Sequence, residues 1–518
     1  MNDSGVHEVV IVGAGFGGLG MAIRLKQEGI DDFVVLERGA DVGGTWWANS
    51  YPGCQCDIPS NLYSFSFAPK HDWETAYPMR DQILEYLRDC ARRFDVLRHT
   101  RLSCELLGAT WVADQQHWEL ETTGEPLAAR VLVVAPGLLS EPWSPELPGL
   151  DRFEGKAFHT ARWDHGDDLT GKRVALIGSG ATAVQAVPAI QPRVGKLHLF
   201  QRTPPWVIPH MDHPVRPQLR ELYGRVPELQ RLSRAAIYAL RELMVPGLTR
   251  HPRWLKAQEL NARLNLRRQV PDPELRRRLT PDYEIGCKRI VLSNDWYPAI
   301  QAPNVELVSS GVSEVRERSI VDGDGIEREI DTLVFATGFK PAELPIAERL
   351  RGREGRTLAE VWDGSPEAYL GTTASGFPNL FMLYGPNVNL GHNSIVYMLE
   401  SQINYVSDAL RTMRDRGAAE VEVRAAAQDA YNFEIQERLA QSVWNNGGCG
   451  SWYFDSNGRN SIQWPGFTFE YRRRTRRFDT PAYRLAPPTR AAGQSSSVGG
   501  GGGSAGAAAG VGGAGSVT

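Results

Sequence analysis

The sequence predicts an α/β protein, because one structural pattern occurs twice in the chain. In each occurrence a short apolar run leads directly into a glycine-rich turn, and residues with helical spacing follow. A further apolar strand comes after each helix and completes a strand–helix–strand unit. The two units begin about 165 residues apart, and a chain of 518 residues is long enough for two or three domains. We therefore expect two Rossmann-like dinucleotide-binding domains.

The first unit lies at the N-terminus and carries the turn Gly13-Ala-Gly15-Phe-Gly-Gly18. We expect a strand over residues 9–12, a helix over 19–28 and a second strand over 33–36. In such a turn the first glycine allows a tight bend, the second lets a pyrophosphate approach the backbone, and the third lets the helix pack closely on the strand. Glu37 ends the second strand, where a carboxylate can accept hydrogen bonds from ribose hydroxyls.

The second unit has the turn Gly178-Ser-Gly180-Ala-Thr182-Ala183, in which Ala183 takes the third glycine position. We expect strands over 173–177 and 197–200 and a helix over 184–190 that Pro188 shortens or bends. The second strand ends on Gln201-Arg202-Thr203 and has no acidic residue. Arg202 would bind a 2′-phosphate that an acid would repel. The second nucleotide is therefore expected to be NADPH, although Arg202 is also typical of a surface cation.

The remaining chain alternates between further strands and helices. We expect a helix over 81–94, strands over 118–122, 130–134, 305–308 and 333–336, and a helix over 394–413. Residues 210–280 are Arg-rich and helical, as in an insertion. Two dinucleotide units of different ribose chemistry imply a flavin together with a nicotinamide. The expected domains are a first FAD-binding part at 1–145, an NADPH-binding domain at 146–334, a second FAD-binding part at 335–490, and a disordered Gly/Ala/Ser tail at 491–518.

Composition excludes several classes of protein. The formal net charge of −4 is a poor match for a nucleic-acid binder. No run of eighteen apolar residues and no secretory signal is visible, so we expect a cytoplasmic protein with no membrane partner. The six cysteines include no CxxC pair, which argues against a metal site or a thioredoxin-like centre and favours reduced thiols.

One segment resembles a known family. The run Phe153-Glu-Gly155-Lys-Ala-Phe-His159-Thr-Ala-Arg-Trp163-Asp164 is similar to the fingerprint FxGxxxHxxxW(P/D) of Baeyer–Villiger monooxygenases. The resemblance spans about residues 8–480. It includes Gly43-Gly-Thr45-Trp46, Tyr51-Pro-Gly53, Gly286-Cys-Lys-Arg289 and Phe335-Ala-Thr-Gly338. The chain departs from the family at Val134-Ala-Pro136-Gly137, where many relatives have Ala-Thr-Gly.

The resemblance implies roles for individual residues. Arg289 corresponds to an active-site arginine that stabilises a peroxide anion near the flavin, and Asp57 to the carboxylate that orients it. Lys288 would hold the 2′-phosphate together with Arg202. Further cofactor contacts are implied for Thr45, Trp46, Gly338, Asn393 and Trp452.

From the residues alone, other interpretations stay open. Asp57 before Ile-Pro-Ser is typical of a turn, and Arg289 of a solvated strand residue. Trp452 is equally typical of an ordinary packed residue. For His159 the resemblance implies a part in coupling the two domains rather than proton transfer, and a structural histidine fits as well.

The implied activity is that of an NADPH- and FAD-dependent Baeyer–Villiger monooxygenase. Such an enzyme adds O2 at flavin C4a, and the resulting peroxide converts a ketone into an ester or lactone. The sequence leaves three alternatives: a flavin-dependent N- or S-monooxygenase, an NADPH-flavin reductase that passes electrons to a partner, and a non-catalytic nucleotide sensor. The ketone and the oligomeric state are not readable from the sequence.

Overall fold

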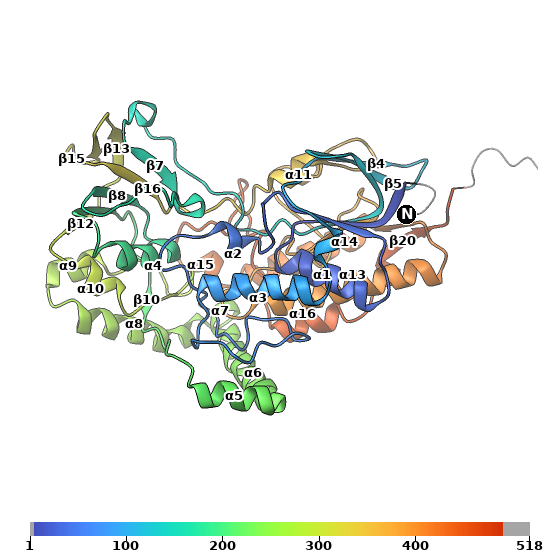
Figure 1. The fold of residues 1–518 in the computed structure, drawn as a ribbon, viewed down its shortest axis with the longest axis horizontal. Helices are drawn as coiled ribbons and strands as arrows, with labels where there is room; N and C mark the ends of the chain where they lie inside the picture. The colour runs from blue at the N-terminus through green and yellow to red at the C-terminus, as the bar shows by residue number, and fades with distance from the viewer. Residues whose placement is uncertain (1–4, 490–518) are drawn as a thin grey trace, which may run out of the picture.

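The fold was obtained as a computed structural model that describes residues 5–489. The tail expected at 491–518 lies outside the described residues. The chain forms two main sheets, which lie on opposite sides of the molecule in Figure 1 with helices packed around each. This arrangement confirms the α/β fold class and places the two glycine-rich turns in different sheets.

The first sheet has the strand order β17-β4-β5-β6-β1-β2-β3, and β18 also pairs with β6. Strands β1, β2 and β6 are parallel, with Val9 opposite both Phe33 and Val131. The strands are β1 Val6–Val12, β2 Phe33–Leu36, β3 Thr100–Arg101, β4 Leu106–Val112, β5 His117–Thr122, β6 Leu127–Val134, β17 Leu350–Arg351 and β18 Leu380–Met382. Segments beyond residue 335 thus return to the sheet that the N-terminus begins.

The second sheet is parallel throughout, with the order β12-β9-β8-β16-β7. Its strands are β7 Lys156–His159, β8 Arg173–Ile177, β9 Lys196–Phe200, β12 Val305–Val308 and β16 Thr332–Phe335. Three smaller sheets pair β10 Val207–Ile208 with β11 Val291–Leu292, β13 Val312–Val315 with β14 Ser319–Asp322 and β15 Glu327–Glu329, and β19 Glu420–Val423 with β20 Tyr483–Ala486.

Helices pack around both sheets. In the first part they are α1 Phe16–Gln27, α2 Thr45–Ala48 and α3 Arg80–Arg93; in the second, α4 Ala181–Ile190, α5 Pro217–Arg225, α6 Pro227–Glu242, α7 Val245–Thr249, α8 Lys256–Gln269, α9 Pro273–Arg278 and α10 Trp296–Ile300. The C-terminal part adds α11 Pro345–Arg349, α12 Leu358–Trp362, α13 Ile395–Asp415, α14 Ala425–Leu439, α15 Val443–Asn446 and α16 Thr468–Arg474. Figure 1 shows α5 and α6 projecting below the body of the molecule.

The sequence predicted the starts of two helices three residues too late. Helices α1 and α4 begin at Phe16 and Ala181, not at 19 and 184. The third glycine position therefore lies inside the first turn of each helix. A Cβ at Gly18 would lie 1.7 Å from the Gly13 carbonyl oxygen, so the helix can start this close to the strand only with glycine there. Helix α4 continues to Ile190, two residues beyond Pro188.

Candidate active site

A cavity of about 1840 Å³ opens between the two sheets. Its lining includes the last residue of four parallel strands: Val12, Leu36, Ile177 and Phe200. Ligands of open α/β sheets bind outside these carboxyl ends. The volume exceeds that of an ordinary single-ligand pocket, roughly 300–1,000 Å³. The cavity is therefore large enough for two dinucleotides at once.

The first glycine turn forms one wall of this cavity. Gly13 has a φ of +98°, and a Cβ there would lie 2.5 Å from the Ala135 carbonyl oxygen. Gly13 and Gly15 line the cavity, whereas Gly18 packs behind them. Glu37 lies at the end of β2 and accepts hydrogen bonds from the amides of Ala14 and Gly39, both at 2.7 Å. The turn thus has the cradle shape and the buried carboxylate that an adenosine ribose and pyrophosphate fit.

The second glycine turn faces the cavity from the other sheet. A Cβ at Gly178 would lie 2.2 Å from the Ala336 carbonyl oxygen, while Gly180 borders open space. Thr182 lines the cavity beside it, and Ala183 is fully buried behind. The Ser179 hydroxyl donates to the carbonyl of Thr203 at 2.6 Å, which ties the turn to the end of β9.

Two cations border the second turn. Arg202 and Lys288 both line the cavity, and the Lys288 ammonium lies 5.0 Å from the centre of the Tyr283 ring. Burial, and then the nearby charge of Arg202, hold the pKa of Lys288 below its usual range. Neither side chain forms an ion pair with a carboxylate within residues 5–489. Two unneutralised cations that face one cavity fit an anion such as a 2′-phosphate.

Arg289 and Asp57 form a bidentate ion pair, 232 residues apart in the sequence. Arg289 Nε and Nη2 each lie 2.6 Å from a carboxylate oxygen of Asp57, and Nη1 donates to the Leu390 carbonyl at 3.0 Å. Protein surrounds the pair, and 29% and 30% of the two side chains remain exposed because they line the cavity. The guanidinium is thus held in one orientation beside open space.

Both members of this pair are charged. Burial opposes ionisation of Asp57, but the charge and hydrogen bonds of Arg289 outweigh it and hold the pKa of Asp57 below its usual range. Burial likewise opposes the charge on Arg289, and Asp57 more than offsets it, so the pKa of Arg289 lies above its usual range. At neutral pH the cavity wall therefore holds a fixed ion pair, with the guanidinium of Arg289 held in place by the Asp57 carboxylate.

The other expected site residues fall into two groups. Thr45, Trp46, Thr203, Gly338, Asn393 and Trp452 line the cavity. The fingerprint residues lie mostly behind it, and only Trp163 of that set reaches the cavity, where it packs edge-on against Phe158. Phe153, Gly155 and His159 lie on and before β7, the edge strand of the second sheet.

His159 has a structural environment. Its Nδ1 accepts from the Ala161 amide at 3.0 Å, and its ring packs edge-on against Phe339. Burial lowers the pKa of His159 to about 4, so the imidazole is neutral at pH 7. The ring does not line the cavity and is not placed to move a substrate proton.

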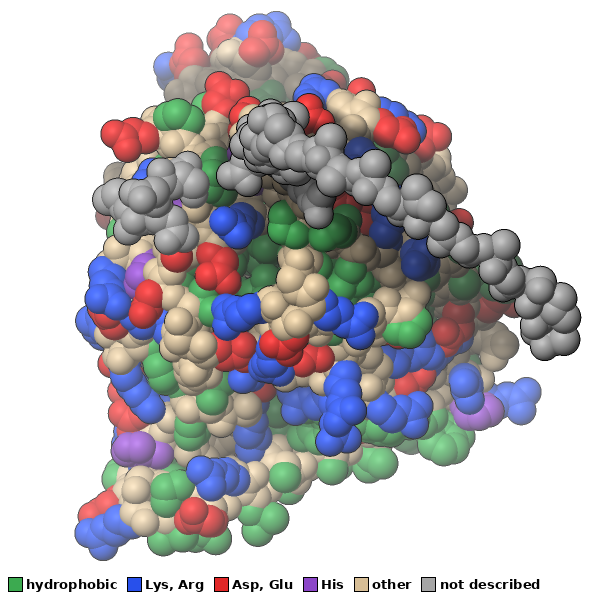
Figure 2. Space-filling view, turned by 90° about the vertical axis from the view of Figure 1, so that its right-hand side faces the viewer, with side chains coloured by type: hydrophobic (Ala, Val, Ile, Leu, Met, Phe, Trp, Pro, Cys, Tyr) green, Lys and Arg blue, Asp and Glu red, His purple; other side chains and the backbone are tan. Residues whose placement is uncertain are grey.

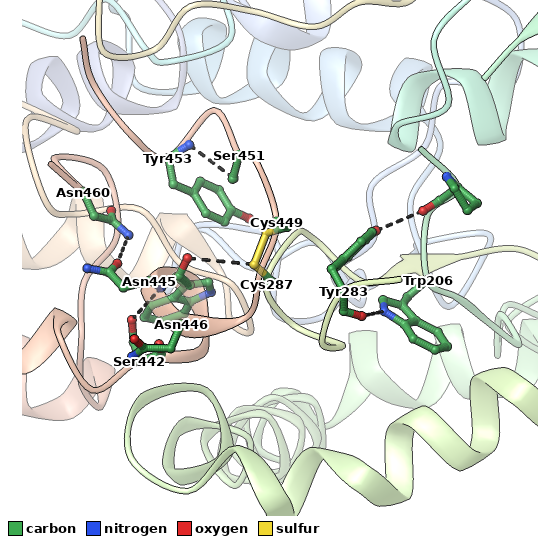
Figure 3. Close-up of a disulfide and its surroundings, with 12 residues drawn as sticks. Trp206, Tyr283, Cys287, Ser442, Asn445, Asn446, Cys449, Ser451, Tyr453 and Asn460 are labelled. Atoms are coloured by element: carbon green, nitrogen blue, oxygen red, sulfur yellow. Dashed lines mark hydrogen bonds between the residues drawn. A yellow bond between two sulfur atoms is a disulfide. The ribbon is translucent and has the colours of Figure 1, made fainter. Parts of the chain in front are cut away.

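The structure corrects the expectation of reduced thiols for one pair of cysteines, while Cys54, Cys56, Cys90 and Cys104 are free and buried. Cys287 and Cys449 form a disulfide, with their Cα atoms 6.1 Å apart. Figure 3 shows the bond joining the segment after Tyr283 to the loop that carries Ser451 and Tyr453. Cys287 directly precedes Lys288 and Arg289, so the bond ties the Trp452 loop to the active-site segment. Because the two cysteines are 162 positions apart in the sequence, no local spacing could signal the pair.

Sequence reasoning also missed residues on α6. Arg241 Nη2 donates to the Asp57 carbonyl at 3.3 Å, which braces the ion pair from behind. The buried Glu242 carboxylate accepts from the Asn393 side-chain amide at 2.7 Å and from the Thr468 amide at 2.9 Å. Neither residue stands in a recognisable motif. Only the fold brings them beside the site.

No group of three or more His, Cys, Asp or Glu side chains that could hold a metal ion occurs within residues 5–489.

Comparison with known proteins identifies the relatives of this chain. A family model described as "Flavin-binding monooxygenase-like" matches residues 6–350. A "Baeyer-Villiger monooxygenase" of Streptomyces coelicolor is 50% identical over 490 residues and covers 94% of each chain. A second, from Pseudomonas aeruginosa, is 48% identical over 488 residues, which is 94% of this chain and 92% of that protein.

Solved structures agree with these relatives. Cyclohexanone monooxygenase from Rhodococcus sp. Phi1 bound to NADP+ superposes with a TM-score of 0.83 at 30% identity, over 93% of this chain and 99% of that chain. The OTEMO complex with FAD and NADP gives a TM-score of 0.83 at 27% identity, over 93% and 100%.

Proposed function

Because this chain belongs to the Baeyer–Villiger monooxygenases of the flavin-binding monooxygenase-like family, we propose that its Arg289–Asp57 pair is the charge centre of an NADPH- and FAD-dependent ketone oxidation. The overall reaction is ketone + O2 + NADPH + H⁺ → ester or lactone + NADP⁺ + H2O. The observation that carries the proposal is the bidentate contact of Arg289 with Asp57 at the wall of the cavity.

The chain uses FAD and NADPH, and the two glycine turns are the proposed places for them. FAD fits the first turn, where Gly13, Gly15 and Glu37 form the cradle. NADPH fits the second, where Gly178 and Gly180 form the corresponding turn. When bound, these groups supply the hydride and the electrons that activate O2.

Arg202 and Lys288 are the proposed selectors of NADPH over NADH. Both face the cavity beside the second turn, and neither has a carboxylate partner within residues 5–489. A 2′-phosphate would neutralise both charges, whereas NADH would leave them unpaired. Lys288 and Arg289 thus divide two tasks between adjacent residues, cofactor binding and charge stabilisation.

Arg289 is the proposed catalytic residue, and Asp57 positions it. Asp57 fixes the guanidinium plane through two hydrogen bonds and leaves Nη1 bonded to Leu390. A cation fixed in advance stabilises anionic oxygen that develops during the reaction, without reorganising at that moment. Tyr384 and Tyr453 interact electrostatically with the guanidinium, and they help to exclude water from it.

The proposed substrate class is a ketone. A structurally similar enzyme is named for its action on cyclohexanone, and an electrophilic carbonyl is the group that an Arg-stabilised oxygen nucleophile attacks. Soft nucleophiles such as sulfides do not require this cation.

Substituting Arg289 tests the proposal. We expect Arg289→Ala to keep anaerobic reduction of the flavin by NADPH within about twofold of wild type and to lower ester formation by 10²-fold or more. Arg289→Lys, which keeps the charge but loses the bidentate contact, should fall between the two. Exposed Arg411→Ala is the matched control. Ester formation that survives Arg289→Ala would remove this residue from the mechanism.

A further inference from the structure

Helix α6 is built with its polar side inward. Gln230 Nε2 donates to the Lys70 carbonyl at 2.5 Å, and Arg234 Nη1 donates to the Asn61 carbonyl at 3.0 Å. Glu242, at the last turn, is buried against Asn393 and Thr468. A surface helix of a globular protein normally turns its apolar side to the core. These inward hydrogen bonds hold α6 with its polar side toward the protein interior.

The apolar side of this helix consequently faces outward. Leu232, Leu240 and Leu243 lie eight and three residues apart, a spacing that puts them on one face, and these residues are 66%, 68% and 70% exposed. Helix α5 packs beside α6 and adds the exposed side chains of Leu222 and Val226. We call these five residues the leucine face.

Exposed apolar residues concentrate in this part of the chain. Eleven of the 22 large hydrophobic side chains exposed in residues 5–489 lie between residues 211 and 264, including Trp254. Figure 1 places α5 and α6 at the bottom of the molecule, and Figure 2 shows hydrophobic side chains with Lys and Arg among them along the same lower edge. Exposed apolar residues gathered on neighbouring helices mark an interaction surface rather than random exposure.

The charge of the surrounding segment indicates what the surface binds. Residues 210–280 contain 15 Lys and Arg against 7 Asp and Glu, a formal charge of +8 in a chain whose total is −4. Several exposed arginines of the segment have no acidic partner within residues 5–489; they are Arg216, Arg250, Arg253, Arg267 and Arg268. A second copy docked through the same face would bring two arginine-rich segments of like charge together, which is unfavourable. An anionic occupant is complementary.

We propose that the leucine face docks on an anionic lipid surface. Leucines on one side of a helix, in a segment that has an excess of arginine and an exposed Trp, are typical of helices that lie in a membrane interface. No helix within residues 5–489 is long and apolar enough to cross a bilayer, so the contact is peripheral. The sequence had led us to expect no membrane partner, because a hydropathy scan detects spans and not the outward side of an inverted helix.

Vesicle binding of the purified holoenzyme tests this inference. The probes are unilamellar vesicles of phosphatidylcholine alone and of phosphatidylcholine with phosphatidylglycerol, at low and at high salt. We expect co-sedimentation with the anionic vesicles only, and weaker binding at high salt. The triple variant Leu232→Glu, Leu240→Glu, Leu243→Glu should reduce the partition coefficient at least about tenfold. Phe433→Glu is the matched control, since Phe433 is equally exposed, at 70%, on α14.

Two further measurements keep the outcomes distinct. The triple variant should oxidise a water-soluble ketone at the wild-type rate, because none of its three positions lines the cavity; lost activity would call for single Leu→Glu variants in the vesicle assay. Sedimentation velocity reports the mass in solution. Failure of the wild-type enzyme to bind anionic vesicles would overturn the proposal. A wild-type dimer that dissociates in the triple variant would also overturn the proposal, because the leucine face would then bind a second copy.

Discussion

Asp57→Asn isolates the positioning role of Asp57, because it keeps the size of the side chain and removes its charge. Wild-type Asp57 makes two charge-assisted hydrogen bonds of 2.6 Å to Arg289. A neutral amide has one acceptor oxygen, so one bond is lost and the other becomes charge–neutral. Charge-assisted bonds contribute about 1.5–3 kcal/mol each, and the two side chains are about 30% exposed, so the expected loss is about 2 kcal/mol.

The lost interaction free energy can be converted into an expected decrease in the rate of ester formation. At about 1.4 kcal/mol per tenfold, 2 kcal/mol lowers the population of correctly oriented Arg289, and with it ester formation, roughly 30-fold. The assay measures ester by gas chromatography, hydrogen peroxide by a peroxidase reaction, and anaerobic flavin reduction by absorbance. We expect flavin reduction to be unchanged and the electrons to appear as peroxide. Asp89→Asn, on the exposed side of α3, controls for charge alone. An unchanged ester yield per NADPH in Asp57→Asn would refute the positioning role.

Three further predictions follow from the same geometry. Arg202→Ala should raise the KM for NADPH about tenfold to a hundredfold and leave the KM for NADH unchanged, because one ion pair with the 2′-phosphate is lost. Cys449→Ser should free the Trp452 loop from Cys287 and raise the fraction of NADPH electrons released as peroxide. His159→Asn should reduce the decrease in the free energy of unfolding between pH 7 and pH 4.5, as measured by urea unfolding at the two pH values.

The sign of the His159 prediction follows from its lowered pKa. The folded pKa of about 4 lies below the usual 6.5, so the contribution of the neutral ring to stability is complete above pH 6.5 and is lost as pH falls toward 4. At pH 4.5 the loss amounts to roughly 2–3 kcal/mol, which the variant should not show. An equal loss of stability in His159→Asn would contradict this prediction. The prediction for Arg202→Ala fails if the preference for NADPH is unchanged, and that for Cys449→Ser fails if peroxide release is unchanged.

Local rules account well for the two dinucleotide units. Strands β2 and β8 have the bounds expected from the apolar runs, and the glycine turns lie where the patterns put them. The rules succeed here because the turn, the strand and the helix are all encoded within about thirty residues. The helix starts were misplaced because the third glycine position belongs to the helix, which a spacing rule does not reveal.

Contacts between distant segments needed more than local rules. Nothing in composition brings Asp57 to Arg289 across 232 residues, and only the resemblance to a family suggested that pair. The same holds for Arg241, which braces Asp57 from a helix whose residues face opposite to the usual pattern. The disulfide escaped prediction because its cysteines are ordinary in spacing and neighbours only in space.

The most direct test of the account is oxygen insertion measured with labelled O2. The holoenzyme is incubated with NADPH, ¹⁸O2 and a panel of cyclic and open-chain ketones that includes cyclohexanone, and the products are analysed by mass spectrometry. The account predicts an ester or lactone that contains one ¹⁸O atom, with one NADPH oxidised for each product molecule. NADPH oxidation that yields only hydrogen peroxide with every ketone, with no ¹⁸O in any ester or lactone, would contradict it.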